Sequence, residues 1–150
     1  GEGLGFHGLS GNVREFMGNI MKPGVNWRDV HTLSNRVACE HLKEAGVFVG
    51  DVDEMMAANL CGYFMPHGLG HLMGIDVHDV GGYTDGMQRE TGMGYKSLRT
   101  KRDLAEGMII TVEPGIYLPG KFGMRLEDFG VVTDDGFDVF TNSTHDLVVI

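Results

Sequence analysis

The chain has little cysteine, little positive charge and no long apolar run. Its two cysteines, Cys39 and Cys61, are too few for a disulfide scaffold, and their spacing matches no zinc motif, so we predict both to be reduced. Lys and Arg number 12 against 21 Asp and Glu, which argues against a nucleic-acid partner. No apolar run approaches the roughly 20 residues that span a membrane. The start also lacks a signal-peptide pattern, so we expect a cytoplasmic protein without a membrane partner.

Glycine and apolar residues are abundant. The chain of 150 residues contains 24 glycines and is 42% hydrophobic, which suits one domain with a substantial core. Residues 1–11 are glycine-rich, and we expect them to be poorly ordered.

The spacing of apolar residues changes along the chain. It is helical over 12–22, 27–45 and 52–60, and we predict a helix over each range, with Asn26 capping the second and Gly46 ending it. After Cys61, short apolar runs bounded by glycine predict strands, several of them antiparallel, within 63–80, 106–118, 123–133 and 137–142. Asp134-Asp135-Gly136 predicts a turn between the last two. Helices followed by a mostly antiparallel sheet indicate an α+β domain.

Three histidines lie within twelve residues of the segment FMPHGLGHLMGIDVHDVGGY, residues 64–83. His67, His71 and His78 are surrounded by glycines, and Pro66 argues against a helix there. An extended backbone is therefore expected. Structural histidines are the alternative interpretation. Two carboxylates in apolar segments further along favour a divalent-metal site of the hydrolytic kind.

Glu113 and Glu127 are those carboxylates. Pro114 favours an extended backbone at Glu113, which shares a strand face with Ile109 and Thr111. Burying a carboxylate costs several kcal/mol in order of magnitude unless a cation compensates. Either Arg125 or a metal ion can be that cation.

Three further charged residues have two interpretations each. Arg125 and Glu127 alternate along one strand, so they either present a cation and a ligand to one pocket or form a surface pair. Arg99, in the long polar loop 84–101, is a binding residue or a solvated charge. Asp76 orients an imidazole or caps a turn. One His and two Glu suffice for one divalent ion with positions left for water, and no convincing ligands for a second ion are present.

The segments FMPHGLGHLMGIDVHDVGGY, SLRT, GMIITVEPGIY and MRLEDFGVVT resemble, in this order, the C-terminal part of the catalytic domain of the pita-bread metallopeptidases. The resemblance covers residues 12–140 and is strongest to the prolidases, which hydrolyse Xaa-Pro dipeptides. It implies a partial pita-bread fold, in which helices wrap a pseudo-symmetric sheet.

The resemblance also implies roles for individual residues. His71, Glu113 and Glu127 are the expected metal ligands, and Glu113 is also expected to shuttle protons. His78 is expected to contact the substrate and stabilise the reacting carbonyl. His67, Arg99 and Arg125 are expected to line the substrate pocket, where guanidinium groups suit the carboxylate of a C-terminal proline. The implied mechanism is attack by a metal-bridging hydroxide at a pair of ions, commonly manganese.

The chain departs from the family in two ways. The family's two aspartate ligands, eleven residues apart, have no match here and would precede Gly1. The separate N-terminal domain is also absent. We therefore expect residues 1–150 to be the C-terminal portion of a longer enzyme. This chain alone should hold one ion or none and hydrolyse little.

Some features leave alternatives open. Only thirteen residues separate Glu113 from Glu127, as in shorter family members, and the tail THDLVVI matches the family poorly. The partners implied are dipeptides ending in proline and, for the full-length protein, a second copy in a homodimer. The alternatives are an Xaa-Pro aminopeptidase and a non-catalytic pita-bread binding module.

Overall fold

The computed structural model describes residues 19–83 and 87–143. The predictions for residues 1–11, for most of the helix over 12–22 and for the tail after residue 143 lie outside the described residues. Residues 19 and 20 are helical, as predicted for the end of that first helix.

The helices form where periodicity and capping predict them. Helix α2 spans Trp27–Glu44, and the Asn26 side chain accepts a hydrogen bond of 3.0 Å from the backbone N–H of Arg28. Gly46 follows it with a φ of 73°, a conformation that favours glycine. Helix α3 spans only Val52–Ala57, so the predicted helix over 52–60 is too long. Asn59 adopts a left-handed conformation that ends it, and the short 3-10 helix η1 follows at Leu60–Tyr63.

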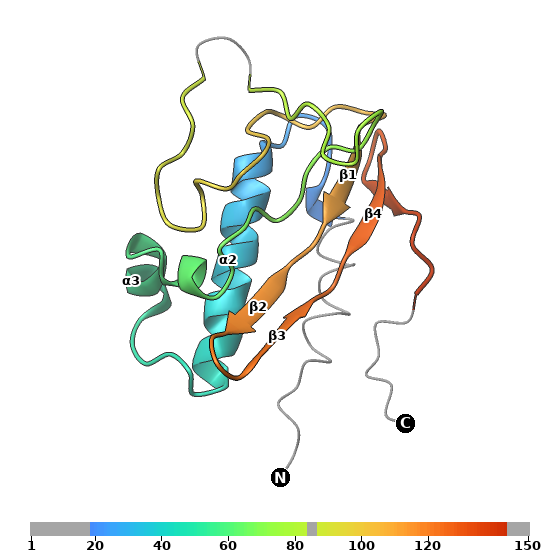
Figure 1. Ribbon diagram of the computed structural model, residues 1–150. Helices are drawn as coiled ribbons and strands as arrows, with labels where there is room; N and C mark the ends of the chain where they lie inside the picture. The colour runs from blue at the N-terminus through green and yellow to red at the C-terminus, as the bar shows by residue number, and fades with distance from the viewer. Residues whose placement is uncertain (1–18, 84–86, 144–150) are drawn as a thin grey trace.

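Within residues 19–83 and 87–143, five strands form two small antiparallel sheets (Figure 1). Strands β1 (Ile109–Val112), β4 (Asp128–Val132) and β5 (Phe137–Val139) pair in the order β1-β4-β5. Strands β2 (Gly115–Leu118) and β3 (Phe122–Arg125) pair with each other. The predicted turn joins β4 to β5, and the N–H of Thr133 donates to the carbonyl of Gly136 across it.

The two sheets are parts of one bent ribbon. Each of its two strands is interrupted for two residues, at Glu113-Pro114 and at Leu126-Glu127. The N–H of Leu126 donates to the carbonyl of Pro114 over 3.1 Å and joins the two interruptions. Pro114 has no N–H to continue the ladder. Both glutamates therefore lie at the same level of the ribbon, off the regular strands.

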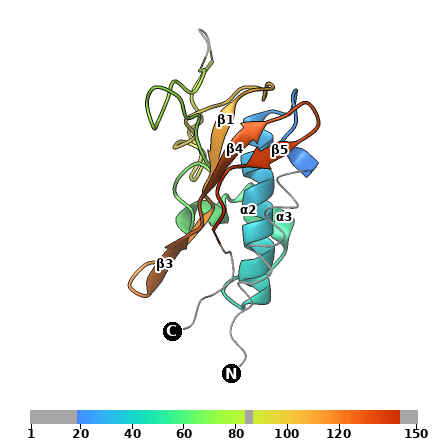
Figure 2. The same ribbon diagram turned by 90° about the vertical axis from the view of Figure 1, so that its right-hand side faces the viewer.

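Helix α2 packs against one face of the sheet (Figure 2). The core between them contains Trp27 and Val30 from α2 together with Ile110, Val112 and Val132 from the strands, all almost completely buried. A second cluster joins α2 to α3 and η1 through Cys39, Met55 and Cys61. Both cysteines are free, as predicted, and both are buried. None of the helices within the described ranges is long and apolar enough to cross a membrane.

The prediction of a strand within residues 63–80 is wrong. The segment is extended but makes only an isolated bridge, between Leu72 and Ile110, alongside β1. The N–H of His71 bonds to the Thr111 hydroxyl at 3.0 Å instead of a ladder carbonyl. A Cβ on Gly70 would lie 1.8 Å from the carbonyl oxygen of Thr111. Glycine at position 70 thus permits a backbone approach too close for any other residue.

Candidate active site

Three predicted ligands, His71, Glu113 and Glu127, meet beside the bend of the ribbon. Each offers one ligand atom, and these atoms all lie within 4.8 Å of one another. His71 and Glu113 are buried, whereas Glu127 is exposed. Among residues 19–83 and 87–143 no other group of three His, Cys, Asp or Glu side chains comes together in this way.

The imidazole of His71 is oriented by the backbone of its own segment. Its Nδ1 lies 3.0 Å from the carbonyl oxygen of Leu72, which can only accept, so Nδ1 carries the proton. Nε2 is then the ring nitrogen that points toward the cluster, and it lies 3.4 Å from Oε1 of Glu113. A protonated nitrogen that donates to a backbone carbonyl is the usual support of a metal-binding histidine.

Glu113 divides its two oxygens between two neighbours. Oε1 faces His71 and accepts from the Thr111 hydroxyl at 3.2 Å, so Thr111 and Glu113 share a face as predicted. Oε2 lies 3.3 Å from a guanidinium nitrogen of Arg125. The sequence left Arg125 and a metal ion as the possible cations beside this carboxylate. The ion pair with Arg125 is formed, and the other oxygen faces the ligand cluster.

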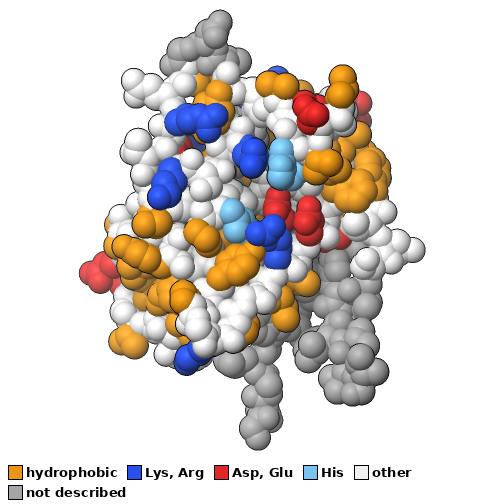
Figure 3. Space-filling model, in the orientation of Figure 1, with side chains coloured by type: hydrophobic (Ala, Val, Ile, Leu, Met, Phe, Trp, Pro, Cys, Tyr) orange, Lys and Arg blue, Asp and Glu red, His pale blue; other side chains and the backbone are white. Residues whose placement is uncertain are grey.

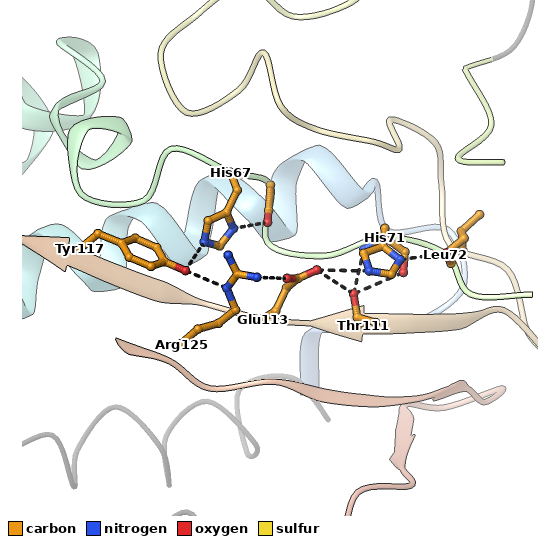
Figure 4. A network of polar contacts seen from close by, with 8 residues as sticks. His67, His71, Leu72, Thr111, Glu113, Tyr117 and Arg125 are labelled. Carbon is orange, nitrogen blue, oxygen red and sulfur yellow. Dashed lines mark hydrogen bonds and ion pairs between the residues drawn. The ribbon is translucent and has the colours of Figure 1, made fainter. Parts of the chain in front are cut away.

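A second set of contacts connects Arg125 to His67 through Tyr117 (Figure 4). The Nε–H of Arg125 donates to the Tyr117 oxygen at 2.7 Å. Nδ1 of His67 donates to the carbonyl of Gly68. Its Nε2 lies 3.1 Å from the Tyr117 hydroxyl and accepts a hydrogen bond from it. The pKa of Arg125 is raised, first by the hydrogen bond to Tyr117 and further by the carboxylates of Glu113 and Glu127.

The remaining predicted site residues lie at the surface. His78 is exposed, and its ring stacks edge-on against His71 with 4.3 Å between centroids. Arg99 is also exposed and takes no part in the network of Figure 4. Asp76 is exposed, and its backbone carbonyl accepts from Gly74 within a tight loop. Basic, acidic and histidine side chains gather on one face of the molecule, bordered by hydrophobic ones (Figure 3).

Sequence reasoning missed Tyr117, which holds both Arg125 and His67 in place. A signal was present in the strand alternation, since Glu113, Gly115 and Tyr117 are two residues apart and face the same side. The alternation of Arg125 with Glu127 on a single strand was also an oversimplification, since β3 ends at Arg125.

One imidazole nitrogen and two carboxylates make a donor set suited to a divalent cation of intermediate hardness. Two of these ligands, His71 and Glu113, are held by further hydrogen bonds. An arginine and a histidine beside them can bind an anionic ligand. The site therefore has the composition of a divalent-metal centre.

Residues 12–134 match the model of metallopeptidase family M24, and the chain belongs to this family. It is 44% identical to the human Xaa-Pro dipeptidase over 85% of this chain and 31% of that enzyme. It is 34% identical to a probable Xaa-Pro aminopeptidase of Botryotinia fuckeliana, over 86% of this chain and 33% of that protein. The chain therefore spans about a third of the length of these relatives.

Solved structures agree with the fold. The aminopeptidase PepP of Pseudomonas aeruginosa superposes with a TM-score of 0.69 at 37% identity, over 87% of this chain and 29% of that one. The proline aminopeptidase P II of Yersinia pestis gives a TM-score of 0.73 at 28% identity, over 91% of this chain and 30% of that one. The predicted α+β, partial pita-bread fold is confirmed.

Proposed function

We propose that this chain is part of a metal-dependent peptidase that hydrolyses Xaa-Pro dipeptides. The observation that carries the proposal is the convergence of His71, Glu113 and Glu127, whose ligand atoms lie within 4.8 Å of one another. The 44% identity to an Xaa-Pro dipeptidase supports the dipeptide as substrate.

The residues present fit a divalent ion such as Mn²⁺. Nε2 of His71 faces the ligand cluster because Nδ1 is used by the Leu72 carbonyl, and the carboxylate of Glu113 is buried with one oxygen directed at His71. A bound ion would supply Lewis acidity toward a peptide carbonyl and would make a water molecule more acidic. His71, Glu113 and Glu127 would hold it.

The other side chains would bind and orient the dipeptide. Arg125 carries a permanent positive charge next to the ligand cluster and would pair with the carboxylate of the C-terminal proline. Tyr117 fixes the direction of that guanidinium through its 2.7 Å hydrogen bond. Arg99 would add a second cation from its loop. His67 and His78 would contact the peptide, and His78 would donate to the carbonyl oxygen that becomes negative.

Glu113 would also move protons. Its carboxylate, 3.3 Å from the Arg125 guanidinium, would accept a proton from water. The protonated carboxyl group of Glu113 would then return the proton to the departing amine of proline.

The residues that complete the centre would come from outside this chain. Three side chains leave most positions of an ion open, and β3 is exposed along its whole length. We propose that residues 1–150 are the C-terminal portion of a catalytic domain, and that the longer enzyme is cytoplasmic and dimeric. The chain alone would then bind metal weakly and turn over little substrate.

An Xaa-Pro aminopeptidase is the second candidate, because a probable enzyme of that type is 34% identical over 86% of this chain. The two are separated with native protein captured by an antibody against this chain. A dipeptidase cleaves Gly-Pro faster than a longer peptide with proline second, whereas an aminopeptidase shows the reverse order. Absence of metal-dependent cleavage of both peptides would contradict both functions and favour a binding module.

A further inference from the structure

His31 is a completely buried histidine of helix α2 that belongs to none of the groups described above. Its Nδ1 accepts a hydrogen bond of 3.2 Å from the backbone N–H of Leu69. Leu69 lies in the glycine-rich segment that carries His67 and His71. The contact thus joins the central helix directly to the segment that forms the candidate site.

The backbone of Leu69 is held from both sides. Its N–H donates to His31, and its carbonyl accepts from the N–H of Glu113 at 2.7 Å. Two residues further on, the carbonyl of His71 accepts from the N–H of Thr111 at 2.9 Å. A shift of Leu69 would therefore move both ends of the His71–Glu113 pair, which are separated by 3.4 Å.

The contact with Leu69 fixes the tautomer of His31. A backbone N–H can only donate, so Nδ1 must be unprotonated and the single ring proton must lie on Nε2. Burial disfavours a second ring proton. It lowers the pKa of His31 to about 4, although a hydrogen bond to the backbone of Gly94 opposes this shift. The ring is thus neutral at physiological pH.

The tautomer in turn determines the role of Asn35, one helical turn further along. The Asn35 amide nitrogen lies 3.2 Å from Nε2 of His31, and its buried Oδ1 has no hydrogen-bond partner. A half-turn of the amide exchanges these two atoms and allows Oδ1 to accept the Nε2 proton. This arrangement satisfies the buried oxygen and pairs a donor with an acceptor.

We infer that His31 is a positioning residue: as the neutral Nε2–H tautomer, held by Asn35, it anchors Leu69 and thereby sets the placement of His71 and Glu113. This role of His31 deepens the proposed function. Only the expected effect on metal affinity rests on that function, and the anchoring of Leu69 does not.

Two substitutions of His31 distinguish the role of Nδ1 from the role of Nε2. Asn carries an oxygen at the position of Nδ1, so His31→Asn keeps an acceptor for Leu69. Gln reaches the position of Nε2, so His31→Gln keeps the contact to Asn35 and loses the acceptor for Leu69. Both replacements are polar and neutral, which makes them a matched pair.

The experiment uses the whole 150-residue chain. Nitrogen NMR of the wild type should show an unprotonated Nδ1 and a protonated Nε2 on His31. Amide hydrogen exchange at Leu69 and Glu113 should accelerate about tenfold or more in His31→Gln and stay near wild type in His31→Asn. The amide of Val132 in β4, which donates to the carbonyl of Met108 and not to the histidine segment, is the internal reference and should not change.

Titration with Mn²⁺ supplies the functional measurement. Support from outside the ligand shell is worth about 10–100-fold in metal affinity. We expect a loss of about tenfold in His31→Gln and recovery in His31→Asn. Equal affinities and equal exchange in the two variants would overturn the inference, as would a protonated Nδ1 in the wild type, even if His31→Gln fails to fold. A wild-type chain that binds no Mn²⁺ but shows the expected exchange pattern contradicts the proposed function and supports the role of His31.

Discussion

Nε2 of His71 lies 3.4 Å from Oε1 of Glu113, although the two residues come from different segments of the chain. His71 is held by hydrogen bonds to Leu72 and Thr111, and Glu113 by bonds to Thr111 and Arg125. Both side chains are therefore placed before any ion binds. Such preorganisation is what a metal site requires of its ligands.

The close approach of Gly70 to β1 should be intolerant of a side chain. A Cβ in Gly70→Ala would lie 1.8 Å from the carbonyl oxygen of Thr111, so the histidine segment must move away from the sheet. Overpacking of this kind typically costs about 1–3 kcal/mol. We expect a loss of that size in urea unfolding. Gly92→Ala is the control, since its nearest atom is 3.5 Å away. Equal stability of the two variants would contradict the packing described for residues 69–73.

The buried His31 should make stability depend on pH. Its pKa is lowered from 6.5 to about 4. Between these values the unfolded chain binds a proton that the folded chain does not, so the free energy of unfolding falls as pH drops from 6.5 toward 4. The slope from one group is at most about 1.4 kcal/mol per pH unit. On going from about pH 7 to about pH 5, the wild type should therefore lose about 2 kcal/mol more of its free energy of unfolding than His31→Asn does. Parallel losses in the two proteins would show that His31 titrates normally.

The N-terminus of α2 depends on Asn26. Its side chain caps the helix through Arg28 and also donates to Asp103 at 2.8 Å, which ties the helix to the loop before β1. Loss of such a cap costs about 1 kcal/mol. Asn26→Ala should lower the free energy of unfolding by about this amount, and the exposed Asn142→Ala should change it little. A difference near zero between the variants would argue against the cap.

The ribbon end near the candidate site should promote association. Phe122, Met124 and Leu126 are exposed along and beside β3, and Ile75 and Val77 are exposed in the loop after His71. Exposed apolar surface of this kind favours self-association. Light scattering should show a mass that rises with concentration, and Met124→Lys with Ile75→Lys should reduce the rise. A monodisperse monomer at all concentrations would contradict the prediction.

Periodicity and local chemistry predicted much of this fold. Helix α2, its Asn26 cap and the turn before β5 follow from short-range patterns that act within a few residues. The position of Glu113 and Glu127 at the same level of the ribbon could not be predicted in the same way. It depends on two interruptions, at Pro114 and Leu126, that face each other only after the ribbon has formed.

The segment around His71 shows a second limit. Its extended backbone was predictable from Pro66 and the surrounding glycines, but a regular strand was the wrong extrapolation. The segment bonds to β1 partly through the Thr111 hydroxyl, which no alternation pattern reveals. Tyr117 and His31 were missed for a related reason: each acts through a partner distant in sequence, His67 in one case and Leu69 in the other.

Calorimetric titration of the chain with Mn²⁺ is the direct test of whether His71, Glu113 and Glu127 bind a metal ion. We expect weak binding of one ion, with affinity reduced by at least about tenfold in Glu113→Gln, because a neutral amide then replaces one of the two carboxylates of the cluster. Glu106→Gln, an exposed glutamate before β1, is the matched control and should bind like the wild type. No binding by the wild type, or equal affinity in Glu113→Gln and Glu106→Gln, would contradict a metal centre at His71, Glu113 and Glu127.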